Sequence, residues 1–492
     1  MGKERINPTE VRSVTEVGTW DLEADVVVVG CGCAGACAAI AAAEAGAEVL
    51  VAERASGGGG TSANSGGQIY MGGGTPVQTA CGFEDTPDEM YKFLMAALGP
   101  EPDAAKTRVY CDESVAHFHW LEAHDVPFKR SFYPVRGGTE SPTDDCLAFS
   151  GGENAYPFDR IAKPAPRGHK PQFTGSAGGF LMQRLIAASE RAGVRFECDA
   201  RCDTLVVDAR EHGRVVGAVL WQDKRERLVR ARRGVVLAAG GFMMNEEMVK
   251  RYVPVIWACE YKLGTDGDDG RAIRMAMGAG ADIVRMDAAE IGYPVGPPDK
   301  LLCGILVNGY GQRVINEDTY LGRIGQEGIF RQNGELFLIV DTSFYEPTVY
   351  GLHAAFVEET VAELEQSIGF PTGALQSTVE YYNRFAAQGT DPLFHKSPEL
   401  LRPLDTPPYA AFDLRVSRQD GIGKSYCAFT LGGLHTLPTG EVLSPDGRMV
   451  PGLYAAGRTT SGLAKGGYCS GISLGDGTFF GVRAGRSAAQ RK

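Results

Sequence analysis

The sequence predicts an α/β protein of at least two domains, and three observations carry that prediction. The chain has 492 residues, which is more than one hydrophobic core usually supports. Residues 25–54 follow the order of strand, glycine turn, helix and strand, as in a parallel α/β unit. From about Met286 the pattern changes to a hairpin, two helices and proline-bearing connections. A second domain of different build is therefore expected inside the chain.

Composition and charge exclude several classes of function. The chain is 43% hydrophobic and 22% charged, as in ordinary globular domains, and its formal net charge is -12. Because the balance is acidic and no long basic run occurs, no nucleic-acid partner is expected. No stretch reaches the roughly 18 apolar residues of a membrane helix, and residues 1–20 lack the apolar core of a signal peptide. We expect a cytoplasmic protein with no integral membrane segment.

The twelve cysteines predict reduced thiols, with no metal site. The cluster CGCAGAC at 31–37 falls in a tight glycine turn that needs small side chains, and the pair at 198 and 202 has no second pair of ligands nearby. Three histidines at 117, 119 and 124 have spacings that do not suit one metal ion. We expect these histidines at the surface.

The first glycine turn predicts dinucleotide binding. A buried strand at 26–29 leads into Gly30, Gly32 and Gly35, and an alanine-rich helix follows. One glycine permits the tight turn, one lets the backbone approach a pyrophosphate, and one lets helix and strand pack closely. The start of the helix, near Ala34, offers free amides and a positive dipole end to phosphates.

The segments after that helix predict further cofactor contacts. Glu53 ends the second strand, 49–52, at the place where a carboxylate accepts hydrogen bonds from a ribose. The glycine-rich loop that follows is too long for a plain connection, although a flexible loop is its alternative interpretation. The hydroxyls of Thr61, Ser62 and Ser65 are available there to an extended cofactor. GVVLAAGGF at 234–242 is a buried strand ending in small residues, and GLYAAGRTTSG near the C-terminus repeats that design.

Together these motifs resemble the FAD-binding flavoproteins of the fumarate reductase and succinate dehydrogenase superfamily. The resemblance adds GGTSANSGG, DDGRAIRMAMGAGA and SLGDGTFFGVRAG to the segments above and covers nearly the whole chain. It implies an α/β, Rossmann-like FAD-binding domain of the glutathione-reductase type, formed from residues 1–284 and 430–492. An inserted α+β catalytic cap is expected at 285–429, with a hairpin at 305–320 and helices within 353–369 and 372–389. The glycine- and proline-rich segment between Phe128 and Gly179 is either a lid or plain surface.

The resemblance also implies how FAD is held. Some relatives attach the flavin through a histidine in the early loop, and here Gly60 stands near that place, so noncovalent FAD is expected. The residues expected to contact FAD are Gly30, Gly32, Ala34, Gly35, Glu53, Arg54, Thr61, Ser62, Ser65, Gly66, Gly67, Ala239, Gly240, Asp269, Arg458, Ser473 and Leu474.

The dicarboxylate-binding residues of the fumarate reductase branch are absent from the matching segments. When GRTTSGLAKGGYCSGI is aligned without gaps, Ala464 falls on that branch's histidine and Tyr468 on its arginine. A second arginine of the branch follows an Asn-Glu pair, and after the pair at 316–317 this chain has Tyr320 nearby. Arg323 could still reach inward, which keeps a carboxylate substrate open as an alternative.

Replacing arginine by tyrosine changes the substrate that the pocket suits. An arginine matches a carboxylate bidentately and stays charged. A phenol donates one hydrogen bond to a neutral carbonyl, and its ring offers an apolar wall. With GGGTPVQTACGFEDTPDEMYKFL, Tyr320 and GGYCSG, the chain resembles the 3-ketosteroid Δ4-(5α)-dehydrogenases. The Δ1-dehydrogenases carry a Tyr-Pro-Gly-x-Gly turn here, from which Cys469 and Ser470 depart, and Δ1 chemistry stays an alternative.

That resemblance implies FAD-dependent oxidation of a 5α-3-ketosteroid to the Δ4-3-ketosteroid. The hydroxyls of Tyr320, Tyr468 and Ser470 together remove the proton at C4, and the order in which they pass it on is left open. The hydride passes from C5 to flavin N5. Backbone amides near Gly471 and Ile472 bind the substrate and stabilise the enolate oxygen. The expected partners are an apolar steroid and an external electron acceptor, since no iron–sulfur cysteine pattern occurs.

Three alternatives stay open at this point. The phenol at 468 could merely pack under the flavin while Ser470 caps a turn. The same donors could serve a flavin enoate or ketosteroid reductase that runs the reaction in reverse. A flavin-binding sensor without turnover is the third, and a hydroxyl cluster near the flavin favours an enzyme over it.

Overall fold

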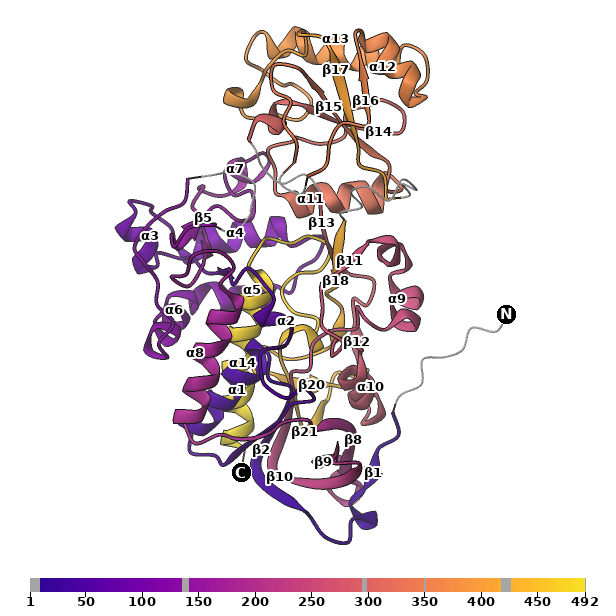
Figure 1. Cartoon of the computed structure of the whole chain (residues 1–492). Coiled ribbons are helices and arrows are strands. Elements are labelled where there is room, and N and C mark those ends of the chain that lie inside the picture. The colour runs from indigo at the N-terminus through magenta and orange to yellow at the C-terminus, as the bar shows by residue number, and fades with distance from the viewer. Residues whose placement is uncertain (1–8, 135–140, 294–298, 349–350, 417–425, 492) are drawn as a thin grey trace, which may run out of the picture.

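A nine-stranded sheet brings the two ends of the chain together in this computed structural model (Figure 1). In it, β2 (Leu22–Val29) pairs in parallel with β3 (Val49–Ala52) and β10 (Arg225–Leu237), and β10 pairs in parallel with β21 (Met449–Ala455). The α/β fold predicted from the sequence is confirmed. The described residues are 9–134, 141–293, 299–348, 351–416 and 426–491.

The remaining strands of this sheet extend it on both sides. The strand β9 runs antiparallel to β10, with Gln222 opposite Arg225 at the turn between them. These strands are β1 (Arg12–Ser13), β7 (Arg195–Glu197), β8 (Arg201–Asp208), β9 (Arg214–Gln222) and β20 (Glu441–Leu443).

Two small-residue helices pack in backbone contact on this sheet. An added Cβ at Gly481 of α14 (Ile472–Gln490) would overlap the carbonyl oxygen of Ala34 in α1 (Cys33–Glu44). Gly485 makes the same close approach to α1 one turn later. The C-terminal helix is therefore held against the first glycine turn, which explains how both chain ends reach one site.

The segment 128–179, whose residues 135–140 lie outside the described residues, is packed into the molecule and is not plain surface. Arg167 within it is fully buried and pairs with Asp85 at 2.7 Å. The carbonyl of Ser150 accepts a hydrogen bond from the amide of Ser470 at 3.0 Å. This segment therefore supports the glycine turn before α14. Its short elements and those packed beside it are β4 (Ile69–Tyr70), β5 (Leu147–Ala148), β6 (Gly168–His169), α3 (Pro76–Ala80), α4 (Pro87–Ala97), α5 (Ala104–Asp112), α6 (Ser114–Ala123), α7 (Phe158–Ile161) and α8 (Gly178–Arg191).

The histidine prediction was wrong for His117. This side chain is 5% exposed, and its Nε2 hydrogen-bonds to Thr478 Oγ1 at 2.8 Å. Burial lowers the pKa of His117 to about 3, so it is a neutral structural residue between α6 and α14.

A separate four-stranded antiparallel sheet forms the far end of the molecule (Figure 1). Its strand order is β14 (Ile305–Asn308), β15 (Leu336–Asp341), β17 (Tyr409–Asp413) and β16 (Phe356–Glu358). The two expected helices are α12 (Val361–Ile368), which Gly369 ends, and α13 (Ala374–Ala386). The expected hairpin is reduced to β14 and one isolated bridge, because β14 pairs with β15 and Arg313 turns inward to Glu317 at 2.6 Å.

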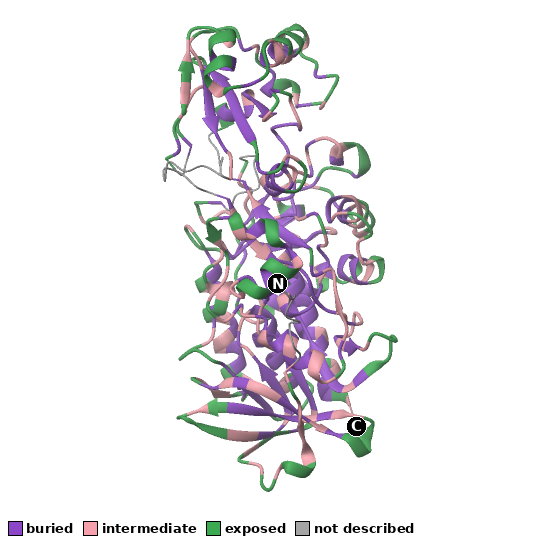
Figure 2. Ribbon diagram, turned by 90° about the vertical axis from the view of Figure 1, so that its right-hand side faces the viewer, coloured by how far each residue is buried: buried purple, intermediate pink, exposed green. Residues whose placement is uncertain are grey.

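Short strands and helices join the two parts. The three-stranded sheet β11-β18-β13 lies between them, and the boundaries at 285 and 429 remain predictions. Figure 2 shows buried residues running through the centre of the molecule. Each helix of the described ranges is too short or too polar to cross a membrane. The α-helices and β-strands not yet named are α2 (Gly60–Ala63), α9 (Glu246–Tyr252), α10 (Arg271–Gly278), α11 (Leu321–Gln326), β11 (Tyr261–Lys262), β12 (Ile283–Val284), β13 (Ala289–Gly292), β18 (Cys427–Thr430) and β19 (Gly433–Leu434).

Candidate functional site

A cavity of about 1060 Å³ begins at the carboxyl ends of β2, β3 and β10, where it is lined by Val29, Ala52 and Ala238. This is the edge at which open parallel sheets bind nucleotides. The residues predicted to bind cofactor or substrate or to act in catalysis all line this cavity, apart from Gly35 and Ile472. One continuous space therefore joins the first glycine turn to the tyrosines.

The three glycines of the first turn have different surroundings. Gly30 has φ +97°, and an added Cβ would lie 2.6 Å from the carbonyl oxygen of Ala238. Gly35 faces back onto Gly30, where a Cβ would overlap the Gly30 carbonyl. Gly32 is open to the cavity, with only Ser62 Oγ within reach, and it begins α1 without a side-chain cap. The start of α1 is thus accessible to an anionic group.

The acidic residue after β3 is tied to this turn. Glu53 is buried, and its two carboxylate oxygens accept hydrogen bonds from the amides of Cys31 at 2.8 Å and Ala55 at 2.9 Å. Arg54 pairs with Asp269 at 3.1 Å, and both residues line the cavity. Both predicted acids therefore line the cavity from fixed positions.

Asp268 is a residue that sequence reasoning missed. Its carboxylate accepts from the amide of Gly241 at 2.8 Å, from the hydroxyl of Thr61, and from Arg458 in an ion pair at 2.9 Å. Asp268 thus joins three distant segments, while its neighbour Asp269 was predicted instead. The Asp-Asp pair in DDGRAIRMAMGAGA was the available signal, and spacing alone does not say which carboxylate turns inward.

The three hydroxyls of the early loop are already engaged. Thr61 donates to Asp268, Ser65 donates to the carbonyl of Ser62 at 2.7 Å, and Ser62 accepts from the amide of Cys33 at 3.1 Å. They line the cavity but chiefly hold its wall in shape. The loop is therefore built into the fold around the cavity.

The cavity fits a dinucleotide with phosphate groups. Arg458 lines it, and within the described ranges its buried Nη1 has no hydrogen-bond partner, while Nη2 pairs with Asp268. A buried guanidinium nitrogen left over in this way suits an anionic ligand. No histidine lies among the described residues that line the cavity, and noncovalent binding remains a prediction. Within the described ranges no three potential metal ligands gather.

The predicted hydroxyl residues lie together in the wall of this cavity. Tyr320 lies at the start of α11, and its ring centroid is 6.4 Å from that of Tyr468, at an interplanar angle of 32°. Phe429 of β18 packs edge-on against Tyr468 with centroids 5.4 Å apart. Ser470 follows two residues later and lines the same space. The wall is aromatic with hydroxyl tips.

The two phenols are hydrogen-bonded in opposite senses. Tyr320 donates its hydroxyl proton to Glu290 Oε1 at 3.0 Å. Tyr468 instead accepts, at its hydroxyl oxygen, a hydrogen bond from the amide of Ser473 at 3.2 Å. Burial raises the pKa of both phenols, so both are neutral near pH 7. The Tyr468 hydroxyl therefore still has its proton to donate, whereas the Tyr320 hydroxyl still has lone pairs with which to accept a hydrogen bond.

Three further predicted residues lie differently from the tyrosines. Gly471 lines the cavity, but the amide of Ile472 donates to the carbonyl of Cys469 at 3.0 Å inside the turn. Arg323 donates to the carbonyl of Tyr156 at 3.2 Å and does not line the cavity. The carboxylate alternative that rested on Arg323 therefore loses its support.

Comparison with known proteins agrees with this geometry. A family model described as an FAD binding domain matches residues 25–474. This chain belongs to that FAD-binding family. FAD is thus the cofactor, and the predicted superfamily is confirmed.

Within the family, one solved structure is similar over the whole chain. The 3-ketosteroid-Δ4-(5α)-dehydrogenase of Rhodococcus jostii RHA1, in complex with 4-androstene-3,17-dione, is 50% identical with a TM-score of 0.93 over 98% of this chain and 100% of that one. The 3-oxo-5-alpha-steroid 4-dehydrogenase of Comamonas testosteroni is 27% identical over 92% of this chain and 96% of its own length. A probable fumarate reductase of Shewanella frigidimarina is 28% identical over 94% and 74%. The predicted resemblance to the Δ4-(5α)-dehydrogenases is confirmed.

Proposed function

We propose that this protein is an FAD-dependent dehydrogenase that converts a 5α-3-ketosteroid into the Δ4-3-ketosteroid. The observation that carries the proposal is the pair of neutral phenols, Tyr320 and Tyr468, in the wall of the FAD cavity. An aromatic wall with hydroxyl tips suits a large, uncharged ketone. The similarity to the Rhodococcus jostii enzyme, solved with a Δ4-3-ketosteroid, supports the same substrate class.

Different residues of the chain bind the C3 oxygen and accept the proton from C4. Tyr468 donates a hydrogen bond to the C3 oxygen, and the amide of Gly471 is the candidate for a second donor. Each such donor stabilises the developing enolate by about 3 kcal/mol. Ser470 and Tyr320 receive the proton from C4, because the Tyr320 oxygen has lone pairs free while its own proton points to Glu290. FAD supplies the acceptor for the hydride of C5.

Electron exit and location complete the proposal. An external acceptor reoxidises the flavin, and the cytoplasm remains the predicted compartment. Neither depends on the arrangement of the tyrosines.

An anaerobic mixing experiment tests the function. The purified flavoprotein is mixed with 4-androstene-3,17-dione or with its 5α-reduced counterpart, and the flavin absorbance is followed while the steroids are analysed. The 5α compound is expected to bleach the flavin and to yield the Δ4-3-ketone. Bleaching by the Δ4 compound with formation of a 1,4-diene would assign Δ1 chemistry, and bleaching by neither would overturn the steroid proposal.

A further inference from the structure

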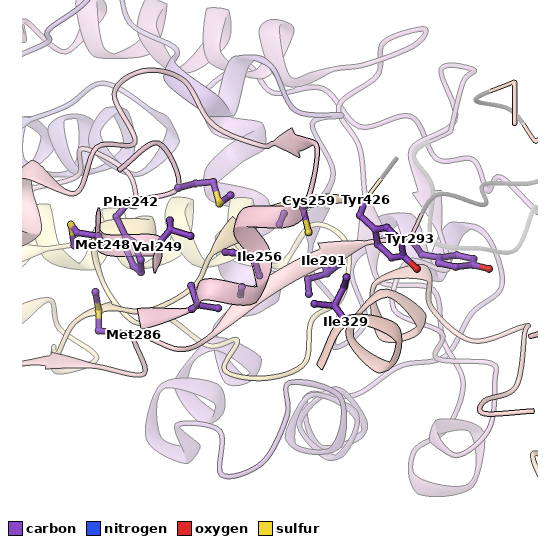
Figure 3. Packing of buried hydrophobic residues seen from close by; sticks show 14 of the residues in the cluster. Phe242, Met248, Val249, Ile256, Cys259, Met286, Ile291, Tyr293, Ile329 and Tyr426 are labelled. Carbon is purple, nitrogen blue, oxygen red and sulfur yellow. The ribbon is translucent and has the colours of Figure 1, made fainter. Parts of the chain in front are cut away.

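A buried carboxylate lies behind Tyr320, and no step above uses it. Glu290 is in the middle of β13, 3% exposed, and it lines the cavity. Because side chains alternate along a strand, its neighbour Ile291 points the other way, into the apolar cluster with Ile329 and Cys259 (Figure 3). That packing anchors the strand and fixes the side on which Glu290 emerges.

The helix that carries Tyr320 is shaped to fit this carboxylate. An added Cβ at Gly322 would overlap Glu290 Oε1, and one at Gly325 would overlap the carbonyl of Ile291. Two glycines therefore let α11 lie directly on β13. Gln326, at the other end of α11, donates to Glu290 Oε2 at 3.1 Å. One carboxylate oxygen thus accepts from the residue that precedes α11, and the other accepts from the last residue of α11.

The surroundings of Glu290 leave its charge uncompensated. The titratable groups that face it are Tyr320 from α11 and Tyr468 and Cys469 from the turn before α14, and Phe429 of β18 is its partner across the sheet. No lysine, arginine or histidine in the described part of the chain forms an ion pair with it. A structural carboxylate at such a place would ordinarily be paired with a cation.

We propose that Glu290 is a positioning residue that receives the hydroxyl proton of Tyr320 when Tyr320 takes up the proton leaving C4 of the steroid, directly or through Ser470. This inference rests on the proposed function. The C4–H bond breaks as a Tyr320 O–H bond forms, and the former O–H bond of Tyr320 breaks as an O–H bond forms on Glu290. The C4–H electron pair becomes the π bond of the new C4=C5 double bond, since the hydride of C5 leaves with its own pair to the acceptor named above. Ionised Glu290 ends as a carboxylic acid, and Tyr320 stays neutral throughout.

The electrostatics agree with that role. Burial raises the pKa of Glu290 to about 8, which is near the operating pH that suits a proton acceptor. A free neutral phenol is a poor base, and a carboxylate behind it removes the need for a charged phenolate. Because the ionised form accepts, the rate should rise with pH up to about 8 and then level.

The test compares the wild type with Glu290→Gln and Glu290→Asp in the holoenzyme. Flavin reduction by the 5α steroid is measured in single turnovers across pH, together with steroid affinity and the infrared carboxylic-acid band without steroid. E290Q should slow reduction at least about 100-fold, abolish the alkaline rise, keep steroid affinity within about twofold and lack the band that titrates near pH 8. E290D, which keeps a titratable group, should restore part of the rate and a displaced pH rise.

A matched control removes a buried carboxylate elsewhere. Glu365 in the cap is also 3% exposed and accepts backbone hydrogen bonds, so Glu365→Gln should leave the pH profile and the infrared band unchanged. An E290Q enzyme with bound FAD and an unaltered pH profile would overturn the proposal. So would an infrared band near pH 8 that survives in E290Q. Failure of the wild type to react with any ketosteroid would instead overturn the proposed function, while the infrared titration still tests the state of Glu290.

Discussion

Tyr320 and Tyr468 lie with ring centroids 6.4 Å apart, and their hydroxyls are hydrogen-bonded in opposite senses. Tyr320 comes from the start of α11, whereas Tyr468 comes from the glycine turn ahead of α14. The two phenols are therefore chemically unequal although their side chains are identical. The Tyr320 hydroxyl donates its proton to Glu290, whereas the Tyr468 hydroxyl accepts from a backbone amide and keeps its own proton for another acceptor.

Removal of the Tyr468 hydroxyl should weaken stabilisation of the enolate. Tyr468→Phe keeps the ring against Phe429 but loses the donor, so single-turnover flavin reduction by the 5α steroid should slow by about 100- to 1,000-fold. Tyr293→Phe is the matched control, because the buried Tyr293 hydroxyl has no hydrogen-bond partner among the residues that the structure describes and Tyr293 does not line the cavity. Equal rates in Tyr468→Phe and the control would contradict the assigned role.

Arg458 should contribute to FAD affinity through its unpartnered nitrogen. Arg458→Lys keeps the charge but loses the fork that reaches both Asp268 and the cavity, which costs about 1.5–3 kcal/mol for a charged hydrogen bond. The dissociation constant for FAD, measured by titrating the apoprotein, should rise by about 10- to 100-fold. Arg448→Lys, at an exposed ion pair, should not change it. Unchanged FAD affinity in Arg458→Lys would remove Arg458 from the cofactor site.

A glycine should be required at position 322 for Tyr320 to keep its place beside Glu290. Gly322→Ala places a methyl group where Glu290 Oε1 lies, and overpacking of this kind costs about 1–3 kcal/mol of stability. The variant should unfold at lower denaturant concentration and reduce its flavin more slowly. Gly18→Ala, at a glycine with open space around it, should resemble the wild type in both measurements. A fully active Gly322→Ala enzyme would show that α11 does not need its close contact with β13.

Stability should depend on pH through Glu290. Burial raises its pKa from 4.5 in the unfolded chain to about 8, so the folded state keeps a proton that the unfolded state releases between those values. The stabilising contribution of Glu290 to the free energy of unfolding is complete below about pH 4.5. It is lost as the pH rises to about 8, at about 1.4 kcal/mol per pH unit. Glu290→Gln cannot lose this proton. In urea unfolding, the free energy of unfolding of the variant should increase relative to that of the wild type from pH 5 to pH 8, by about 4 kcal/mol at most. Parallel plots of unfolding free energy against pH would contradict the raised pKa of Glu290.

The nucleotide-binding part was predicted well because its strands and glycine turns are encoded by residues that are neighbours in the sequence. The strand at 49–52 and the glycines at 30 and 35 do in the structure what their spacing indicates. The two ends of the chain meet through Gly481 and Gly485, whose role depends on a partner helix far away in sequence. Resemblance to known flavoproteins supplied that connection.

The parts that sequence reasoning missed depend on contacts between distant segments. Glu290 is one acid in the run AAEIG, and nothing local in that run indicates a role for it. Its hydrogen bond with Tyr320 depends on the packing of α11 on β13. Asp268 and Asp269 are adjacent, so the choice between them depends on which one faces Arg458. His117 looked like a surface residue because nothing local indicates Thr478 as its partner.

The most direct test of the central claim follows the hydrogen at C5. A 5α-3-ketosteroid carrying deuterium at C5 is mixed anaerobically with the flavoprotein, and flavin bleaching and product mass are recorded together. The account predicts slower bleaching than with the unlabelled steroid and a Δ4-3-ketone that has lost the deuterium. Bleaching at an unchanged rate, with the deuterium retained in the product, would contradict Δ4-(5α)-dehydrogenation by this enzyme.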